Sequence, residues 1–267
     1  YIITADEGVR GGKIIPLKKI TDEALENCPN IKKCIVVKRT GNDVNWIEGR
    51  DVSYDEITKI ASDKFEPEEM SAEDPLFILY TSGSTGQPKG VVLSFGAYAY
   101  ASQTTASLVE VEPEDHLFSY LPLAHITERT CTAGPAIYTG TTVSFTESFE
   151  TFQADLKRAN PTIFLSVPRL WVKFQAGVHA KIPPARLKLL LSIPIVGKLV
   201  AKKIRGELGF GNCRSFGSGS APISPLTLKW YEKLGINIGE GWGMSETSGL
   251  SCGNTPFHAK RIGTIGI

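Results

Sequence analysis

The chain has 267 residues, a net charge of +1 and 42% hydrophobic residues, which is enough for one large or two modest globular domains and gives no reason to expect a nucleic-acid partner. Its five cysteines are odd in number and form no CxxC pair, so we expect neither a zinc knuckle nor a disulfide framework, but reduced thiols in a cytoplasmic protein. No stretch approaches the roughly 20 apolar residues of a membrane-spanning helix, since the best candidate, 187–200, contains Lys188, Pro194 and Lys198.

Segments patterned as strands alternate with segments patterned as helices. We expect strands at 32–38, 76–79, 91–93, 116–121, 141–145 and 162–167, and helices at 54–61, 95–109, 152–159, 196–208 and 226–234. Ser53 and Glu56 predict a capping box for the first helix. Gly209 and Gly235 are expected to follow the last two helices as C-terminal caps. The acidic stretch 63–74 is expected to be a surface connection. This alternation predicts an α/β fold with mostly parallel sheets flanked by helices.

Residues 80–90 read YTSGSTGQPKG and follow an apolar run at 75–79. Glycines let a backbone approach a ligand and turn its N–H groups inward, while hydroxyls add donors and Lys89 adds positive charge. A Walker A loop would need glycine at Pro88, and no GxSxG elbow is present. The loop therefore predicts a polyphosphate cradle, against the alternative of an ordinary surface turn. The residues expected to bind are Thr81, Ser82, Gly83, Ser84, Thr85, Gly86 and Lys89.

Two further glycine-rich turns carry ligand-binding chemistry. Residues 216–222 (FGSGSAP) precede an expected helix, where small residues make room for a flat ligand; alone, they are equally typical of a tight helix-entry turn. Residues 239–249 read GEGWGMSETSG. Here Trp242 offers an aromatic face for a purine, Ser245 a donor for phosphate, and Glu246 a hard oxygen ligand for Mg²⁺. The alternative for this segment is a loop with a structural tryptophan.

The segment LPLAHITER at 121–129 follows an expected strand. A lone histidine such as His125 is usually a packed or surface side chain, so its role depends on the other motifs.

Taken together, these motifs resemble the adenylate-forming superfamily: acyl-CoA synthetases, adenylation domains of peptide synthetases, and luciferases. The resemblance implies part of the N-terminal domain of that fold, with ATP phosphates over residues 81–89. It places His125 beside the substrate carboxylate and the α-phosphate, where its charge would assist attack. It implies Mg²⁺ bound through Thr81 and Glu246, and catalytic roles for His125, Lys89 and Glu246. The other nucleotide-binding residues that it implies are Gly219, Ser220, Ala221, Pro222, Glu240, Gly241, Trp242, Gly243, Met244 and Ser245.

The third motif departs from the superfamily pattern at two positions. Trp242 replaces the commoner tyrosine and Ser245 replaces threonine, and both keep the chemical role. The three turns are expected to converge on a single magnesium nucleotide, so that Lys89, Ala221 and Glu246 surround a common cavity.

The resemblance changes along the chain. Residues 1–90, which end in the phosphate loop, resemble acetyl-CoA synthetase, whereas 91–267 resemble long-chain fatty acyl-CoA synthetase, notably in LPLAH and in SVPRLW at 166–171. Within the latter segment we expect Arg169 and Trp171 to be structural or near the acyl channel. A divergent natural family, a recombinant chimera and an assembly artefact would each produce such a change.

The resemblance implies a fatty acid–CoA ligase that uses ATP, Mg²⁺ and coenzyme A as co-substrate, most simply with a long-chain acid. Acetate activation and acyl loading of a carrier protein are the enzymatic alternatives. The family's C-terminal domain, its adenylation lysine and its ribose-binding aspartate would follow residue 267, and both ends look cut from a longer protein. We therefore expect residues 1–267 alone to have little complete ligase activity.

Charge is distributed unevenly. Of the 28 acidic residues, 21 lie at or before Glu128, and none lies between Asp155 and Glu207, an interval with eleven basic residues. We expect this basic region, 156–206, to attract phosphate, coenzyme A or an anionic membrane surface, or else to be a solvated helix surface with acidic partners elsewhere. A non-catalytic anion- or membrane-binding module is the alternative from another functional class.

Overall fold

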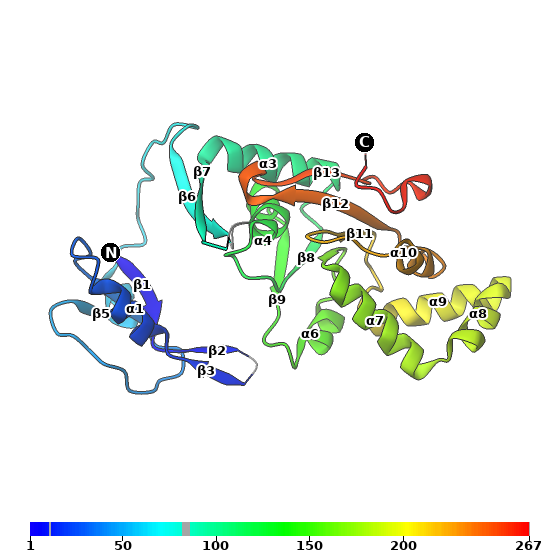
Figure 1. Cartoon of the computed structure of the whole chain (residues 1–267), viewed down its shortest axis with the longest axis horizontal. Helices are drawn as coiled ribbons and strands as arrows, with labels where there is room; N and C mark the ends of the chain where they lie inside the picture. Colours follow the sequence, from blue (N-terminus) through cyan, green and yellow to red (C-terminus); the bar gives the residue numbers. More distant parts are fainter. Residues whose placement is uncertain (11, 82–85, 267) are drawn as a thin grey trace. The chain divides into compact units, whose positions relative to one another are not determined.

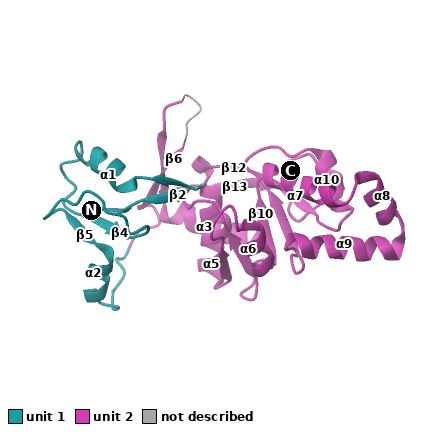
Figure 2. Cartoon of the chain, turned by 90° about the horizontal axis from the view of Figure 1, so that it is seen from below, with its two compact units in different colours: residues 1–69 teal, residues 70–267 magenta. Residues whose placement is uncertain are grey.

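The computed structural model describes residues 1–10, 12–81 and 86–266. The chain divides into two compact units, unit 1 (residues 1–69) and unit 2 (residues 70–267) (Figure 2). The division falls within the acidic connection that the sequence indicates, whereas the change of resemblance at residue 90 lies inside a strand. Among the described residues, no helix combines the length and apolarity needed to cross a membrane.

Unit 1 is a small α/β layer. Three parallel strands lie in the order β1-β4-β5, with two helices and an antiparallel β2–β3 hairpin. The strands are β1 (Ile2–Ala5), β2 (Gly8–Arg10), β3 (Lys13–Ile15), β4 (Cys34–Val37) and β5 (Asp51–Ser53), and the helices are α1 (Leu17–Leu25) and α2 (Tyr54–Ile60). The Ser53 side chain makes no capping bond to α2, so the predicted capping box is wrong. Ser53 also ends β5, where pairing with Val36 fixes its backbone.

Asp6 organises the turn at residues 39–41. Its side chain accepts hydrogen bonds from the backbone N–H groups of Glu7 (2.7 Å), Arg39 (2.9 Å), Thr40 (3.2 Å) and Gly41 (2.8 Å). Burial acts to raise the pKa of Asp6, but these bonds to the ionised form outweigh it and lower the pKa to about 2. The carboxylate is therefore a structural charge.

Because its folded-state pKa lies below its ordinary value of 3.8, Asp6 contributes stability that is complete above pH 3.8. We expect that contribution to be lost as the pH falls from 3.8 towards 2. Asp6→Asn should remove this part of the pH dependence and destabilise unit 1 by about 2 kcal/mol at pH 7. Urea unfolding at pH 2–7, monitored through hydrogen exchange of the β4 amides, measures both the pH dependence and the loss of stability. An unchanged pH slope in the variant would contradict the assignment.

The described part of unit 2 contains three sheets. The hairpin β6 (Pro75–Thr81)–β7 (Lys89–Ser94) is antiparallel, and β8 (His116–Ser119) pairs in parallel with β9 (Thr142–Phe145). The main sheet has the order β10-β11-β12-β13, parallel except for its last pair. Its strands are β10 (Ile163–Ser166), β11 (Ser215–Ser218), β12 (Ile238–Met244) and β13 (Gly249–Gly253).

Helices connect these strands (Figure 1). They are α3 (Phe95–Leu108), α4 (Ile126–Glu128), α5 (Gly134–Thr139), α6 (Phe152–Ala159), α7 (Pro168–Lys181), α8 (Pro184–Ser192), α9 (Pro194–Leu208) and α10 (Pro225–Glu232), with a π-helical turn at Arg129–Ala133 and 3₁₀ turns at Ser245–Thr247 and Ala259–Arg261. Gly209 and Gly235 have φ values of +87° and +71°, as expected of glycines that end helices. The α/β fold class is thus confirmed, with more antiparallel pairing than the sequence indicates.

An aromatic core holds the main sheet against its helices. Trp171 of α7 is fully buried among Phe164, Phe174, Phe210 and Tyr231. Its indole N–H donates to a β11 carbonyl at 3.3 Å, and the Tyr231 hydroxyl donates to the Trp171 carbonyl at 2.6 Å. Trp171 is therefore structural, one of the two roles expected for it.

Candidate functional site

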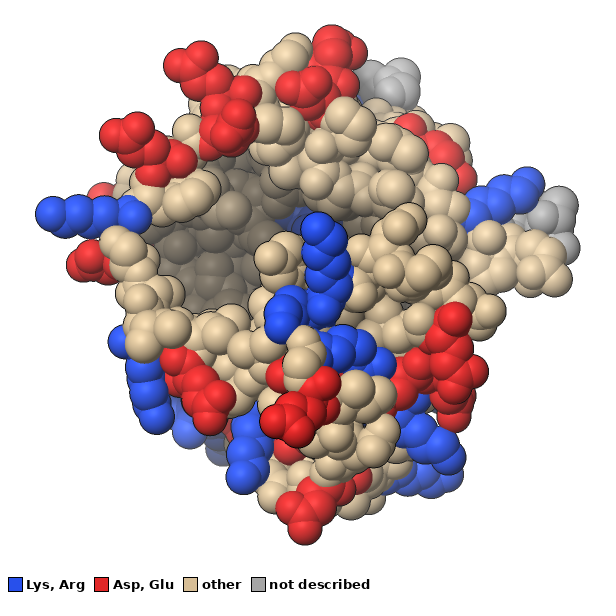
Figure 3. All heavy atoms as spheres, turned by 90° about the vertical axis from the view of Figure 1, so that its left-hand side faces the viewer, with Lys and Arg blue, Asp and Glu red and all other residues tan. Residues whose placement is uncertain are grey.

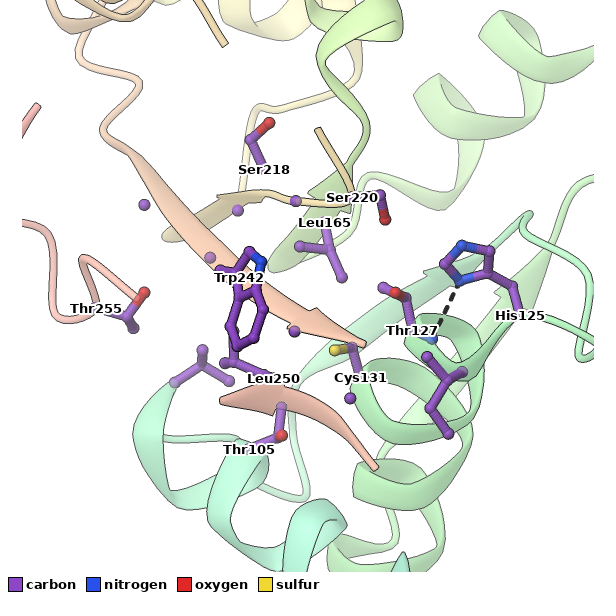
Figure 4. A pocket seen from close by; sticks show the side chains of 18 of the residues that line it. Thr105, His125, Thr127, Cys131, Leu165, Ser218, Ser220, Trp242, Leu250 and Thr255 are labelled. Atoms are coloured by element: carbon purple, nitrogen blue, oxygen red, sulfur yellow. Dashed lines mark hydrogen bonds between the residues drawn. The ribbon is translucent and has the colours of Figure 1, made fainter. Parts of the chain in front are cut away.

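A cavity of about 610 Å³ in unit 2 gathers residues from several of the predicted motifs (Figure 4). Its walls come from the end of β6, the start of α4, residues 163–165 of β10, the whole of β11 with the two residues that follow it, and most of β12. The cavity therefore includes the carboxyl ends of β11 and β12, and ligands of parallel sheets bind beyond such strand ends. The predicted site residues that line it are Thr81, His125, Gly219, Ser220, Gly241, Trp242, Gly243, Met244, Ser245 and Glu246. Motifs more than 160 residues apart in the chain thus share one cavity.

Trp242 stands in the middle of the cavity, between Leu165 and Leu250 in Figure 4. The indole is 45% exposed, so its ring offers a surface to a ligand. The neighbouring glycine, Gly243, permits this placement because β12 and β13 lie very close together. A Cβ at Gly243 would lie 1.8 Å from the Gly249 carbonyl oxygen. An aromatic face of this kind suits a flat, purine-like group.

His125 lies at the other side of the cavity, as the N-cap of α4. Its Nδ1 accepts a hydrogen bond from the Thr127 backbone N–H at 3.2 Å. The other ring nitrogen, Nε2, points away from Thr127 in Figure 4. This geometry leaves Nε2 as the ring nitrogen that could contact a ligand.

Glu246 lies in the 3₁₀ turn after β12 and is exposed at the cavity. The Thr247 hydroxyl fixes the turn, since it accepts from the Met244 N–H at 3.2 Å and bonds to the Gly249 carbonyl at 3.0 Å. Across the described ranges, no three His, Cys, Asp or Glu side chains are grouped to hold a metal. A single carboxylate nevertheless fits Mg²⁺, which takes one or two carboxylates together with substrate phosphates and water.

The phosphate loop is described only in part. Ser82, Gly83, Ser84 and Thr85 lie outside the described residues. Gly86 has φ +83°, and Lys89 pairs with Thr81 across the β6–β7 ladder. Thr81 lines the cavity, whereas the exposed Lys89 is not among its lining residues.

Only part of the second turn, residues 216–222, lines the cavity. Gly219 donates its N–H to the Ser166 carbonyl at 3.2 Å and lines the cavity with Ser220, while Ala221 and Pro222 are exposed and lie outside the lining. The expected meeting of Lys89, Ala221 and Glu246 around one cavity is therefore found only for Glu246. The other two adjoin residues that do line it.

The side chain of Glu240, one of the residues predicted to bind nucleotide, has a structural role. The side chain is buried, and its Oε2 accepts the Gly263 N–H at 2.6 Å. Burial raises the pKa of Glu240, and the Gly263 bond partly offsets the rise. Only its neighbours Gly239 and Gly241 line the cavity.

Several lining residues carry no sequence motif. Among them are Thr105 and Val109 of the α3 region, and Cys131 in the π-helical turn. Burial raises the pKa of the Cys131 thiol to about 11. Ser218 does belong to the 216–222 motif; it ends β11, is 2% exposed, and its hydroxyl has no hydrogen-bond partner among the described residues. The small polar residues along α3 are a weak sequence signal that Thr105 and Val109 lie near a ligand site, and nothing in the sequence distinguishes Cys131.

Comparisons with known proteins agree with this geometry. The profile of the AMP-binding enzyme family matches residues 3–267. Acetyl-coenzyme A synthetase 2 of Pseudomonas putida is 37% identical over 262 residues, and acetyl-coenzyme A synthetase of Vibrio cholerae is 38% identical over 259 residues. Each match covers 93% of this chain but 37% of the relative, so the chain spans little more than a third of their length.

A solved structure shows the same fold. The N-terminal domain of FACL13 from Mycobacterium tuberculosis, determined with an inhibitor bound, superposes with a TM-score of 0.62 at 22% identity. The match covers 88% of this chain and 56% of that one. The motifs, the fold and the family profile lead to one conclusion: the chain belongs to the AMP-binding enzyme family.

Proposed function

We propose that the chain provides the ATP- and acid-binding part of an AMP-forming acid–CoA ligase. In the first step a carboxylate oxygen attacks the α-phosphorus of ATP, forming an acyl-adenylate and releasing pyrophosphate. In the second step the thiol of coenzyme A attacks the acyl carbon and AMP leaves. The observation that carries the proposal is the single cavity that Thr81, His125, Ser220, Trp242 and Glu246 line together.

Each group has a role that its chemistry supports. The adenine stacks on Trp242 beside Gly219 and Ser220, and the phosphates extend towards Thr81 and the loop that ends at Lys89. The Nε2–H of His125 donates to the oxygens between carboxylate and phosphorus. Such positioning and charge neutralisation can carry the reaction without a protein nucleophile.

Glu246 and Thr81 are the residues that would hold Mg²⁺ with the phosphates of ATP. When bound, the ion neutralises phosphate charge. The other nucleotide contacts proposed for the chain are Ser82, Gly83, Ser84, Thr85, Gly86, Ala221, Pro222, Gly241, Gly243, Met244 and Ser245.

The nucleotide site is tested by titrating an ATP analogue into the chain. Lys89→Ala should weaken binding by about tenfold or more, because it removes one charge from the phosphate loop. Lys64→Ala, at an exposed lysine in the acidic connection, is the matched control and should bind as the parent does. Equal affinity in all three proteins would reject the phosphate-loop assignment.

For the acid, we propose a fatty acid. Apolar side chains of Val109, Ile126 and Leu250 line the cavity, and residues 121–129 have the long-chain pattern. Acetate is the second candidate, favoured by the names of the curated relatives. Palmitoyl- and acetyl-sulfamoyl adenosine mimic the two acyl-adenylates and bind without turnover. Tighter binding of the palmitoyl compound supports the fatty acid, whereas equal or tighter binding of the acetyl compound supports acetate.

His125→Ala is expected to weaken the preferred adenylate mimic by about tenfold, the cost of one lost hydrogen bond to a charged group. Affinity for AMP alone should change less, because the predicted contact includes the acyl-phosphate junction. His125→Gln retains an N–H donor and should recover part of the loss. Calorimetric titration of the three proteins measures these differences; equal losses for mimic and AMP would place His125 elsewhere.

We also propose a cytoplasmic location and peripheral membrane contact through residues 156–206. The one face drawn in Figure 3 carries acidic and basic side chains side by side. Sedimentation with anionic vesicles, compared with binding of the ATP analogue, distinguishes a membrane-binding module from a ligase. Vesicle binding without nucleotide binding would favour the module.

A further inference from the structure

A second cavity, of about 620 Å³, lies in unit 2 among α6, α7, α8 and α9. It shares no lining residue with the first cavity. Its apolar wall contains buried side chains from three helices: Phe152, Phe174, Val178, Ile204 and Leu208. Figure 1 shows these helices grouped together. Cavities of roughly 300–1,000 Å³ with mostly apolar walls are typical of small-molecule sites.

Three lysines are among the residues that line this second cavity. Lys173, Lys181 and Lys203 are exposed lining residues, and the acidic ones are Glu150 and Glu207. Glu207 already has a partner, since Lys157 lies 3.1 Å from its carboxylate. Lys157 chiefly, with Lys181 and Lys203, lowers the pKa of Glu207, so these cations lie near one another. The charged residues of the lining are therefore three lysines and two glutamates, one of them already paired, beside an apolar wall.

We propose that this second cavity binds a monomeric, single-chain anionic amphiphile such as a fatty acid, with the chain on the apolar wall and the head group at Lys173, Lys181 and Lys203. A nucleotide would leave the phenylalanines unused, and an uncharged hydrocarbon would leave the lysines unused. The proposal is independent of the proposed ligase activity because the two cavities have different walls.

Two helical glycines provide a matched test. Gly177 of α7 lines the second cavity, and a Cβ built there meets nothing within 4 Å. Gly206 of α9 also has open space around its Cβ but is not a lining residue. Replacing either glycine by leucine favours the helix, by about 0.5–1 kcal/mol relative to glycine. Gly177→Leu alone places a side chain in the cavity.

The experiment titrates a fluorescent 16-carbon fatty acid, below its micelle concentration, into each protein, with acetyl-sulfamoyl adenosine, which has no long chain, present to occupy the first cavity. We expect saturable binding to the parent and to Gly206→Leu, and at least a tenfold weaker affinity in Gly177→Leu. Replacing Lys173, Lys181 and Lys203 together by glutamine should weaken the acid but not the corresponding alcohol.

Equal binding to the two glycine variants would overturn the proposal, as would the absence of saturable binding to the parent. Binding only to anionic vesicles would also overturn it, because the ligand would then be a bilayer surface. Loss of nucleotide binding would refute the proposed function but leave this result unaffected.

Discussion

Replacing Lys18 by methionine is expected to lower the free energy of unfolding of unit 1 by about 3–5 kcal/mol, the cost of removing one partner of a buried ion pair. Lys18 is 1% exposed, and its Nζ lies 2.7 Å from Asp22 Oδ1, 2.8 Å from Asp51 Oδ2 and 3.0 Å from the Asn45 carbonyl oxygen. Methionine retains the chain volume but leaves two carboxylates with one fewer cation.

Arg50 cannot replace the lost charge alone. It pairs with Asp22 and with Asp51, whose side chain is fully buried. Burial acts to raise the pKa of Asp51, but bonds from Arg50, the Ile47 N–H and Lys18 together lower it. Without Lys18, the pKa of Asp51 should rise, so the variant should lose less stability than the parent when the pH is lowered.

Hydrogen exchange of the β4 amides in the whole chain measures this loss locally, and urea unfolding measures it globally. Lys157→Met is the matched control. Its partner Glu207 is exposed, and an exposed pair contributes only about 0–1 kcal/mol. Comparable small losses in both variants would show that the Lys18 network is not a source of stability.

The sequence predicted this network poorly. Lys18 and Asp22 are four residues apart on α1, a spacing typical of an exposed helical pair. Their burial depends on Arg50 and Asp51, which the loop before β5 brings to them from almost 30 residues away. Local pattern cannot report a contact of that kind, because nothing in either segment specifies the other.

Secondary structure followed a similar rule. The helix predicted at 152–159 has the same bounds as α6. The end of α9 and its C-terminal cap, Gly209, were also predicted. Both predictions use the periodicity and capping of a single segment, which are local properties. The strand expected at 162–167 is present as β10, but α7, which begins at Pro168 directly after it, was not expected, although proline is favourable at a first helical position. The antiparallel pairing of β6 with β7 was missed because alternating strands and helices favour parallel pairing.

The candidate site was predictable to the extent that its parts are contiguous motifs. Trp242 and Glu246 are expected from the chemistry of their motif and His125 from the resemblance to the superfamily, and all three line the cavity. Cys131 and Leu250 were not expected, because they reach it through the packing of a π-helical turn and of β13.

Gly243→Ala is expected to weaken binding of an ATP analogue by about 100-fold, equivalent to about 2.7 kcal/mol. The new Cβ would lie 1.8 Å from the Gly249 carbonyl oxygen and 2.5 Å from its carbonyl carbon. Both atoms are backbone, so no side-chain rotation relieves the clash and β12 must separate from β13. Trp242 and Glu246 lie on either side of this position, and both would move away from their places in the cavity.

Gly206→Ala is the control, because it adds the same methyl group where nothing lies within 4 Å. Circular dichroism and the melting temperature of both variants separate local distortion from global unfolding. If Gly243→Ala remained folded and bound the analogue as tightly as Gly206→Ala, the β12–β13 turn would not form the nucleotide site. A folded variant with weakened binding, in contrast, would tie ATP affinity to the spacing of two backbones, a requirement that only glycine meets at this position.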